Sequence, residues 1–182
     1  MGDPKKRHKS YTTPNVPYDT DMFINDLKLL GAYGLRNKKE LWRVKTLLSI
    51  YRRRARELLA MTAAERDVLG RQMIDRVSKM GLIAPNGTLD DILTMSVEDF
   101  LERRFQTFIY RRGMAKSLWQ ARQLISHGHI TIKGREVTSP SYHVKVDDEK
   151  LIEYNIFSPF GNKEHPLRKM LQVEELTDGR KQ

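Results

Sequence analysis

The stretch of residues 102–137 reads ERRFQTFIYRRGMAKSLWQARQLISHGHITIKGREV and combines helical with hairpin patterning. Just before it, Ser96 is followed by acidic residues in the manner of a capping box, so a helix is predicted to begin near Val97. Apolar residues then recur at spacings of three and four, which gives this helix one buried stripe. Gly113 is well placed to end the helix.

A second, shorter helix is predicted between Ser117, which can cap its start, and Gly128, which can end it. About eleven residues are marginal for an isolated helix, so we expect it to be docked on the helix before it. Ile130 and Ile132 then alternate with polar residues, and Gly134 permits a tight turn. The stretch therefore predicts two helices followed by a β-hairpin.

Basic side chains dominate the polar positions of this stretch. Arg104 and Arg111 lie seven residues apart, hence on nearly the same side of a continuous helix, and Arg103 and Arg112 extend the charge around that side. Solvated helices usually intersperse both signs of charge, but acidic residues are almost missing here. Arginine grips phosphate in two places and can stack on a base, so a nucleic acid is the expected partner, with ordinary solvated charge as the alternative. The predicted projecting cations are Arg103, Arg104, Arg111, Arg112, Lys116, Arg122, Lys133 and Arg135.

The same stretch resembles a known RNA-binding module. The segments ERRFQTFIYRRGMAKS, QARQLISHGHITIKGREV and PSY are similar to the helix-helix-hairpin domain, or alpha-L motif, named after small-subunit ribosomal protein S-four. Further segments extend the resemblance, in order, to the archaeal and eukaryotic-type form of that protein family over about residues 1–161. These are MGDPKK, YGLRNKKELWR, YRRRARELL, TLDDIL, VEDFLERR and SPFG. Some bacterial members carry a cysteine zinc cluster, and this cysteine-free sequence departs from that pattern.

The resemblance implies a function that residue spacing alone does not. It implies a structural, non-enzymatic constituent of the small ribosomal subunit in the cytoplasm, without cofactor or metal. Such proteins bind small-subunit (16S-type) ribosomal RNA directly and nucleate subunit assembly. They lie beside other small-subunit proteins near the path by which messenger RNA enters, and neither a membrane nor a second copy is an expected partner. The RNA-facing positions of the family fall here on Arg103, Arg104, Arg111, Arg112, Lys116, Arg122, Gln123, Ser126, His127, Lys133 and Arg135.

Composition permits a nucleic acid or an anionic membrane surface as partner. The 182 residues carry a net charge of +10. This charge is uneven, with +8 in residues 1–60, −3 in 61–100, +7 in 101–145 and −2 in 146–182, so the excess lies in two blocks. No apolar run approaches the roughly 20 residues of a membrane span, and the first residues lack the apolar centre of a signal peptide. Without cysteine, disulfides and cysteine-ligated zinc are excluded.

The first basic block contains a basic arm and a long helix. Residues 1–18 are predicted to be extended or disordered without a partner, the alternative being a solubilising tail. Residues 19–95 are predicted to form a helical domain, whose longest helix should open at Asn37 because apolar residues recur at helical spacing as far as Leu58. The cations on its other faces are predicted to contact RNA, and they are Lys38, Lys39, Arg43, Arg52, Arg53, Arg54 and Arg56.

The resulting fold class is α+β and mainly helical. Residues 96–160 are predicted to form the alpha-L (S-four-like) RNA-binding domain. Its small, mostly antiparallel sheet should be completed by a half-buried strand over 142–146 and a closing strand over 151–154. Residues 161–182 are polar and are predicted to form a mobile tail.

Two functions other than RNA binding in the ribosome are alternatives for a basic chain of this length. An RNA-modifying enzyme that carries this module would need a separate catalytic domain, and residues 61–100 are too few for one. A general basic DNA-binding protein would be separated by competition between duplex DNA and ribosomal RNA. His127 and His129 suggest a metal site only weakly, because the sequence advertises no third ligand. No glycine-rich phosphate loop, nucleophile motif or distinctive pair of carboxylates predicts a catalytic centre.

Overall fold

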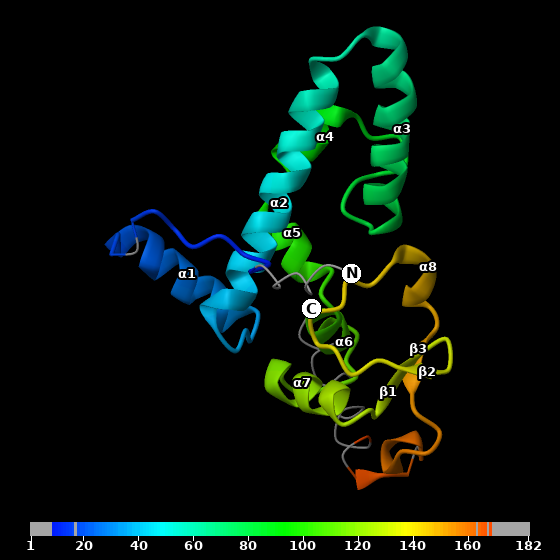
Figure 1. The fold of residues 1–182 in the computed structure, drawn as a ribbon. Helices are drawn as coiled ribbons and strands as arrows, with labels where there is room; N and C mark the ends of the chain where they lie inside the picture. The colour runs from blue at the N-terminus through cyan, green and yellow to red at the C-terminus, as the bar shows by residue number, and fades with distance from the viewer. Residues whose placement is uncertain (1–8, 17, 163, 167, 169–182) are drawn as a thin grey trace, which may run out of the picture.

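A computed structural model describes residues 9–16, 18–162, 164–166 and 168 of the chain. Its described part is mostly helical and carries one three-stranded antiparallel sheet, which confirms the predicted α+β fold class. Figure 1 shows the elements, which in chain order are α1 (Thr20–Ala32), α2 (Lys38–Leu59), α3 (Ala63–Lys79), α4 (Leu89–Thr94), α5 (Val97–Glu102), α6 (Phe105–Arg111), α7 (Leu118–Ser126), β1 (Ile130–Ile132), β2 (Arg135–Glu136), α8 (Val146–Glu149), β3 (Ile152–Tyr154) and the 3-10 helix η1 (Pro159–Gly161).

The long helix α2 organises the first hydrophobic core. Asn37 caps its start by accepting a hydrogen bond from the backbone N–H of Glu40 at 3.1 Å, as the sequence predicted. One face of α2 is buried along its whole length, from Leu41 to Leu58. Helices α3, α4 and α5 pack against that face, and Figure 1 shows α3 running back beside the second half of α2. This core includes Phe100 and Leu101 of α5.

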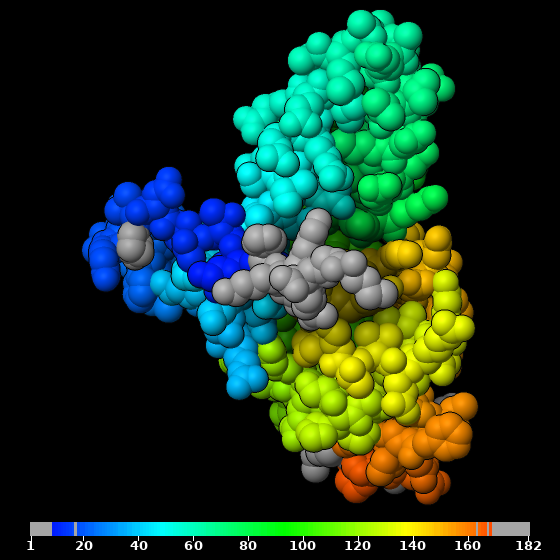
Figure 2. All heavy atoms as spheres, viewed as in Figure 1, coloured from blue at the N-terminus to red at the C-terminus, as the bar shows by residue number. Residues whose placement is uncertain are grey.

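A second core lies between α6, α7 and the sheet. Phe105 and Ile109 of α6 pack with Ile125 of α7 and with Ile130 of β1, and all four side chains are fully buried. The change from the first core to the second falls between Leu101 and Phe105. The domain boundary at residue 96 remains a prediction. Figure 2 shows the two helical arms, α1 and the α2–α3 pair, projecting from the body that holds the second core.

The predicted hairpin is present. Thr131 pairs with Glu136 and Ile132 pairs with Arg135, which leaves Lys133 and Gly134 as a two-residue turn. Both turn residues have positive φ angles, 54° and 74°, as a type I′ turn requires. Strand β3 pairs with the other edge of β1, so the strand order is β2-β1-β3, and the predicted closing strand is confirmed.

The predicted continuous helix from Val97 to Gly113 is wrong. The chain leaves helical geometry at Arg104, whose ψ angle is 137°, so that α5 and α6 are separate helices. The backbone around the break bonds to a segment about forty residues away. The N–H of Val144 donates to the carbonyl of Arg103 at 3.0 Å, and the N–H of Phe105 donates to the carbonyl of Tyr142 at 2.7 Å. These non-local hydrogen bonds replace helical ones, and local periodicity could not reveal them.

The strand predicted over residues 142–146 is also wrong. Within this described segment the only ladder contact is an isolated bridge between Arg104 and His143, and helix α8 begins at Val146. The start of the predicted mobile tail is packed: the guanidinium of Arg168 lies 4.6 Å from the centre of the Tyr154 ring. Residues 169–182, the rest of that tail, lie outside the described residues, as do residues 1–8 of the predicted arm.

Candidate nucleic-acid interface

Arg103 and Arg104 do not project with the other cations, which corrects the prediction that four arginines share one exposed surface. The break between α5 and α6 turns both side chains inward. Arg103 donates from Nε to the carbonyl of Met80 at 2.8 Å and pairs with Glu149. The Arg104 side chain is only 3% exposed. Both arginines therefore hold the fold together, and a contact of either with RNA remains a prediction.

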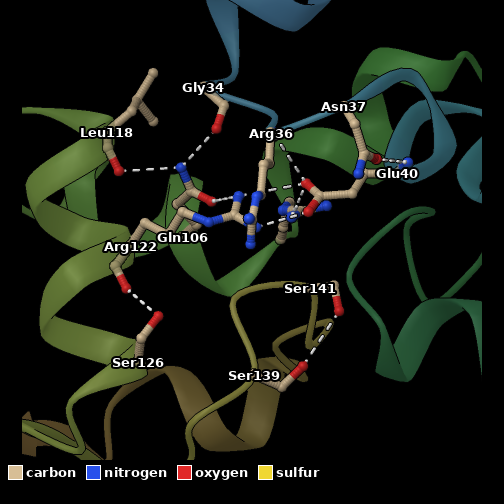
Figure 3. Close-up of polar contacts among 11 residues, drawn as sticks. Gly34, Arg36, Asn37, Glu40, Gln106, Leu118, Arg122, Ser126, Ser139 and Ser141 are labelled. Atoms are coloured by element: carbon tan, nitrogen blue, oxygen red, sulfur yellow. Dashed lines mark hydrogen bonds and ion pairs between the residues drawn. The ribbon is translucent and has the colours of Figure 1, made fainter.

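Glu40 is the acceptor that ties α2 to the second core. Its two carboxylate oxygens lie 2.7 Å from guanidinium nitrogens of Arg104, at the α5–α6 break, and of Arg122, in α7. Figure 3 shows Glu40 and Arg122 pointing toward each other. Burial raises the pKa of Glu40, but the hydrogen bond from Arg122 and the charges of both arginines outweigh it, so the pKa is lowered. For Arg104, burial outweighs the pairing with Glu40 and lowers its pKa, although the guanidinium stays charged.

Gln106 fastens the same junction with neutral hydrogen bonds. Its amide nitrogen donates to the carbonyl of Gly34, just before α2, and to the carbonyl of Leu118 in α7, both at 3.0 Å (Figure 3). Gly34 has a φ of +56°, and a Cβ added there would lie 2.8 Å from the Cβ of Leu118. The close approach of the two backbones therefore requires glycine. The buried Gln106 amide is satisfied on both sides, since its oxygen also accepts from Arg122 at 3.3 Å, and these bonds hold the first basic helix in one position relative to α7.

Neither Glu40 nor Gln106 was among the predicted site residues. Glu40 carried a signal, since it is the single acidic residue between Asp26 and Glu57 in a strongly basic segment. A single acidic residue in a strongly basic segment is expected to pair with cations, but the sequence does not indicate which ones. Gln106 carried no signal, because it sits in the predicted helix like any polar residue.

Arg111 and Arg112 stay at the surface of α6. Arg111 pairs with Glu102 at 2.9 Å and is still 64% exposed, so the pair is screened by water. Glu102 also accepts a hydrogen bond from the hydroxyl of Tyr33, whose pKa is raised to about 12 by burial and by that carboxylate. Arg112 donates to the carbonyls of Glu149 and Ile152 and is exposed.

The outer face of α7 presents polar and aromatic groups together. Gln123, Ser126 and His127 are exposed, as the predicted site requires, and Ser126 donates to the carbonyl of Arg122 at 2.8 Å. Trp119 lies one turn before Gln123 and is 58% exposed. The prediction missed Trp119, although an indole at the surface beside cations is a typical platform for an unstacked base. Its exposure could not be read from the sequence.

The hairpin tip carries exposed charge. Lys133 pairs with Asp148 at 2.6 Å, and that hydrogen bond is the main reason that the pKa of Asp148 is lowered. Arg135 and Lys116 are exposed. The predicted tip position of Lys133 and Arg135 is therefore confirmed.

The cations of α2 divide into some that are engaged within the protein and others that are exposed. Arg52 is half-buried and donates to the carbonyl of Met95, and Lys38 lies 3.6 Å above the centre of the Phe23 ring. The other predicted cations of α2 are exposed, and among them only Arg53 forms an ion pair within the described residues, with Glu57 at 3.7 Å. The exposed group is Lys39, Arg43, Arg53, Arg54 and Arg56.

The described part of the chain carries neither a metal-binding cluster nor a membrane-spanning helix. No group of three or more histidine, aspartate or glutamate side chains there is arranged to hold a metal ion. His129 contacts the Ser158 hydroxyl through Nδ1 at 2.8 Å. No described helix is long and apolar enough to cross a membrane.

Comparison with known proteins identifies the family. The sequence profile described as "S4 domain" matches residues 103–150, which span the break after α5, helices α6 and α7, and the hairpin. The small ribosomal subunit protein uS4 of Ignicoccus hospitalis is 48% identical over 163 residues, which are 90% of this chain and 98% of that protein.

Two further relatives carry the same name. The protein of Hyperthermus butylicus is 44% identical over 175 residues, covering 96% of this chain and 98% of the relative. That of Saccharolobus solfataricus is 47% identical over 161 residues, covering 88% and 89%. The similarity thus runs through both cores and both basic blocks, well beyond the 48 residues of the S4 domain match. The chain belongs to the family of small ribosomal subunit protein uS4.

Proposed function

We propose that this protein is a structural constituent of the small ribosomal subunit that binds small-subunit ribosomal RNA directly. The observation that supports this most is the near full-length similarity to proteins named small ribosomal subunit protein uS4. The arrangement of charge agrees with it. Exposed cations cover parts of α2, α6 and the hairpin. Glu40 is engaged by Arg104 and Arg122, and the exposed cations that do have an acidic partner, Arg53, Arg111 and Lys133, remain more than half exposed.

RNA is recognised in this proposal mainly by shape and by phosphate. In this proposal the exposed cations of α2 provide one RNA-binding surface, and the exposed polar side chains of α7 with Arg111, Arg112 and Arg135 provide another. The Glu40 and Gln106 network fixes the distance between them. Two rigid basic surfaces at one spacing select a folded RNA whose phosphates have the same spacing, with few contacts to base edges.

The family's role in the ribosome extends the proposal. We infer that this protein binds the 5′ region of small-subunit ribosomal RNA early and nucleates assembly there, beside other small-subunit proteins near the path by which messenger RNA enters. A protein that binds before its neighbours must recognise RNA without them. The two-surface arrangement supports this because every contact it needs lies on this one chain.

Direct binding tests the proposal. The full chain is titrated against a transcript of the small-subunit 5′ domain, an unrelated RNA of equal length and duplex DNA, all at physiological salt. We expect the 5′-domain transcript to bind at least about 1,000-fold more tightly than either competitor, at the lower end of specific over nonspecific binding by nucleic-acid-binding proteins. Equal affinity for all three would contradict the proposal and favour a general polycation.

A further inference from the structure

A small cavity lies where α2 meets the loop that follows β2. Its volume is about 150 Å³, and its polar lining consists of Glu40, Arg43, Arg104, Ser141 and His143. A volume equal to about five water molecules is too small for a nucleotide and suits a compact group. Figure 3 shows the Ser139–Ser141 loop beside the charged cluster around Glu40.

The charge around the cavity is positive. Glu40 brings one negative charge, and both of its oxygens are already engaged by Arg104 and Arg122 at 2.7 Å. Arg43 adds a third guanidinium close enough to Arg104 to affect its ionisation. Three guanidinium groups against one carboxylate leave a net charge of +2. His143 adds no charge near neutral pH, because burial and the neighbouring Arg104 lower its pKa.

Arg104 also has a donor that the protein does not satisfy. Its side chain is 97% buried, since only 3% is exposed, yet its Nε–H has no hydrogen-bond partner. A buried donor without an acceptor costs about 1–3 kcal/mol, so such groups are rare. The Nε atom is itself shielded from solvent, so Arg104 offers the cavity the positive charge of its guanidinium group. The Ser141 hydroxyl, which contacts the Ser139 hydroxyl at 3.2 Å, and the exposed Arg43 supply hydrogen-bond donors at this cavity.

We propose that this cavity binds one backbone phosphate of the RNA, held by Arg43 and the Ser141 hydroxyl and attracted by the charge of the Arg104 guanidinium that lines the cavity. The inference rests on the proposed function and names a contact point within it. A phosphate fits in size, carries the opposite charge and offers several acceptor oxygens to a set of donors. Because Arg43 belongs to α2 and Arg104 to the α5–α6 break, the phosphate binds at the junction of the two cores. Ser141 is a contact that neither charge nor helical pattern predicted.

The test maps single phosphates. Transcripts of the small-subunit 5′ domain are ethylated at random phosphates, and the bound fraction is sequenced for the wild-type chain and for Arg43→Gln. We expect the wild type to show interference at several phosphates and Arg43→Gln to lose it at one of them. Binding of the unmodified transcript should weaken about tenfold, as for a lost charge-assisted hydrogen bond. Ser141→Ala should reduce interference at the same phosphate.

Arg54→Gln is the matched control, because Arg54 is an exposed arginine of the same helix that does not line the cavity. It should leave the interference at that phosphate unchanged. Arg43→Lys keeps the positive charge but lacks the planar guanidinium group, so it should show part of the interference that Arg43→Gln loses. Circular dichroism verifies that each variant is folded, which we expect because Arg43 is exposed.

Two failures are distinguishable. If the transcript is preferred over unrelated RNA but Arg43→Gln and Arg54→Gln give the same interference map, the pocket holds only water and this inference is overturned. If the wild-type chain does not prefer the transcript at all, the proposed function itself is refuted, and the RNA occupant is refuted with it.

Discussion

Replacing Glu40 with glutamine is predicted to cost far more stability than removing any other acidic group of α2. The carboxylate holds two guanidinium groups whose side chains are 3% and 19% exposed. Removing one partner of a buried ion pair costs about 3–5 kcal/mol, because the remaining charge stays buried. The glutamine oxygen can still accept one neutral hydrogen bond, and Arg122 is partly solvated. We therefore expect Glu40→Gln to lower the free energy of unfolding by about 2–4 kcal/mol.

Urea denaturation followed by tryptophan fluorescence and circular dichroism measures this loss. At about 2–4 °C per kcal/mol for a chain of this size, the melting temperature should fall by about 5–15 °C. The control is Glu57→Gln on the same helix. Glu57 pairs with Arg53 at 3.7 Å, and both side chains are more than half exposed, so its loss should stay below about 0.5 kcal/mol.

A result in which Glu40→Gln and Glu57→Gln lose the same free energy within about 0.5 kcal/mol would refute the reasoning. It would mean that the Glu40 cluster is solvated and does not fix the two basic surfaces relative to each other. A second check is the double variant Glu40→Gln with Arg104→Met. Because the Arg104→Met change removes the buried charge that Glu40→Gln leaves unpaired, the double variant should recover part of the lost free energy of unfolding. If the losses of the two single variants simply add, the two residues are not coupled and the account is wrong.

Three further predictions concern other parts of the molecule. Replacing both Arg111 and Arg112 with alanine should weaken binding to the 5′-domain transcript about tenfold or more and lower the slope of log affinity against log salt concentration by about 1.4. The melting temperature should fall by only a few degrees, because both side chains are exposed. A collapse of the circular dichroism signal would show that this face is structural. Burial keeps the pKa of His143 in the folded chain below its usual value near 6.5. Between the folded and unfolded pKa values the imidazole is protonated only in the unfolded chain, so the free energy of unfolding falls as the pH drops, by at most about 1.4 kcal/mol per pH unit. Between pH 7.5 and 5.0, His143→Gln should lose less free energy of unfolding than the wild type, and equal losses would show that His143 does not contribute to this pH dependence. Gly134→Val should lower the free energy of unfolding by about 1–2 kcal/mol, because the residue has a φ of 74°. The loss is measured as a shift in the urea midpoint, and the control is Gly31→Val, at a glycine without a positive φ and with open space around it. A smaller loss of stability for Gly134→Val than for Gly31→Val would show that the turn relaxes.

Local rules predicted the elements whose signals lie within a few residues. The Asn37 cap and the apolar spacing that follows it specify α2, and Ser117 with Gly128 specify α7, because caps and stripes act over one or two turns. The Lys133–Gly134 turn was readable for the same reason. The failures at Arg104 and at residues 142–146 share one cause. These segments bond to each other across about forty residues, so each looked regular when considered alone.

The candidate interface was predictable in composition and not in detail. The excess of arginine predicted a polyanionic partner, and that prediction agrees with the function proposed for this family member. Which arginines face solvent depends on acids that are distant in the sequence, since Glu40 takes Arg104 and Arg122 while Glu149 takes Arg103. Helical periodicity assigns a side chain to a face of its own helix. It does not reveal an acceptor that another element brings to that face.

Salt dependence of binding tests the central claim most directly, namely that two fixed basic surfaces recognise one folded RNA. The ratio of affinities for the 5′-domain transcript and an equal-length unrelated RNA is measured as salt is raised. Nonspecific binding weakens steeply for both RNAs, because each neutralised phosphate releases about 0.7–0.9 of a counterion. The account predicts that the transcript keeps a large advantage at high salt and that Glu40→Gln diminishes that advantage. If both RNAs lose affinity together in the wild-type chain, the surfaces act as a polycation and the claim is wrong.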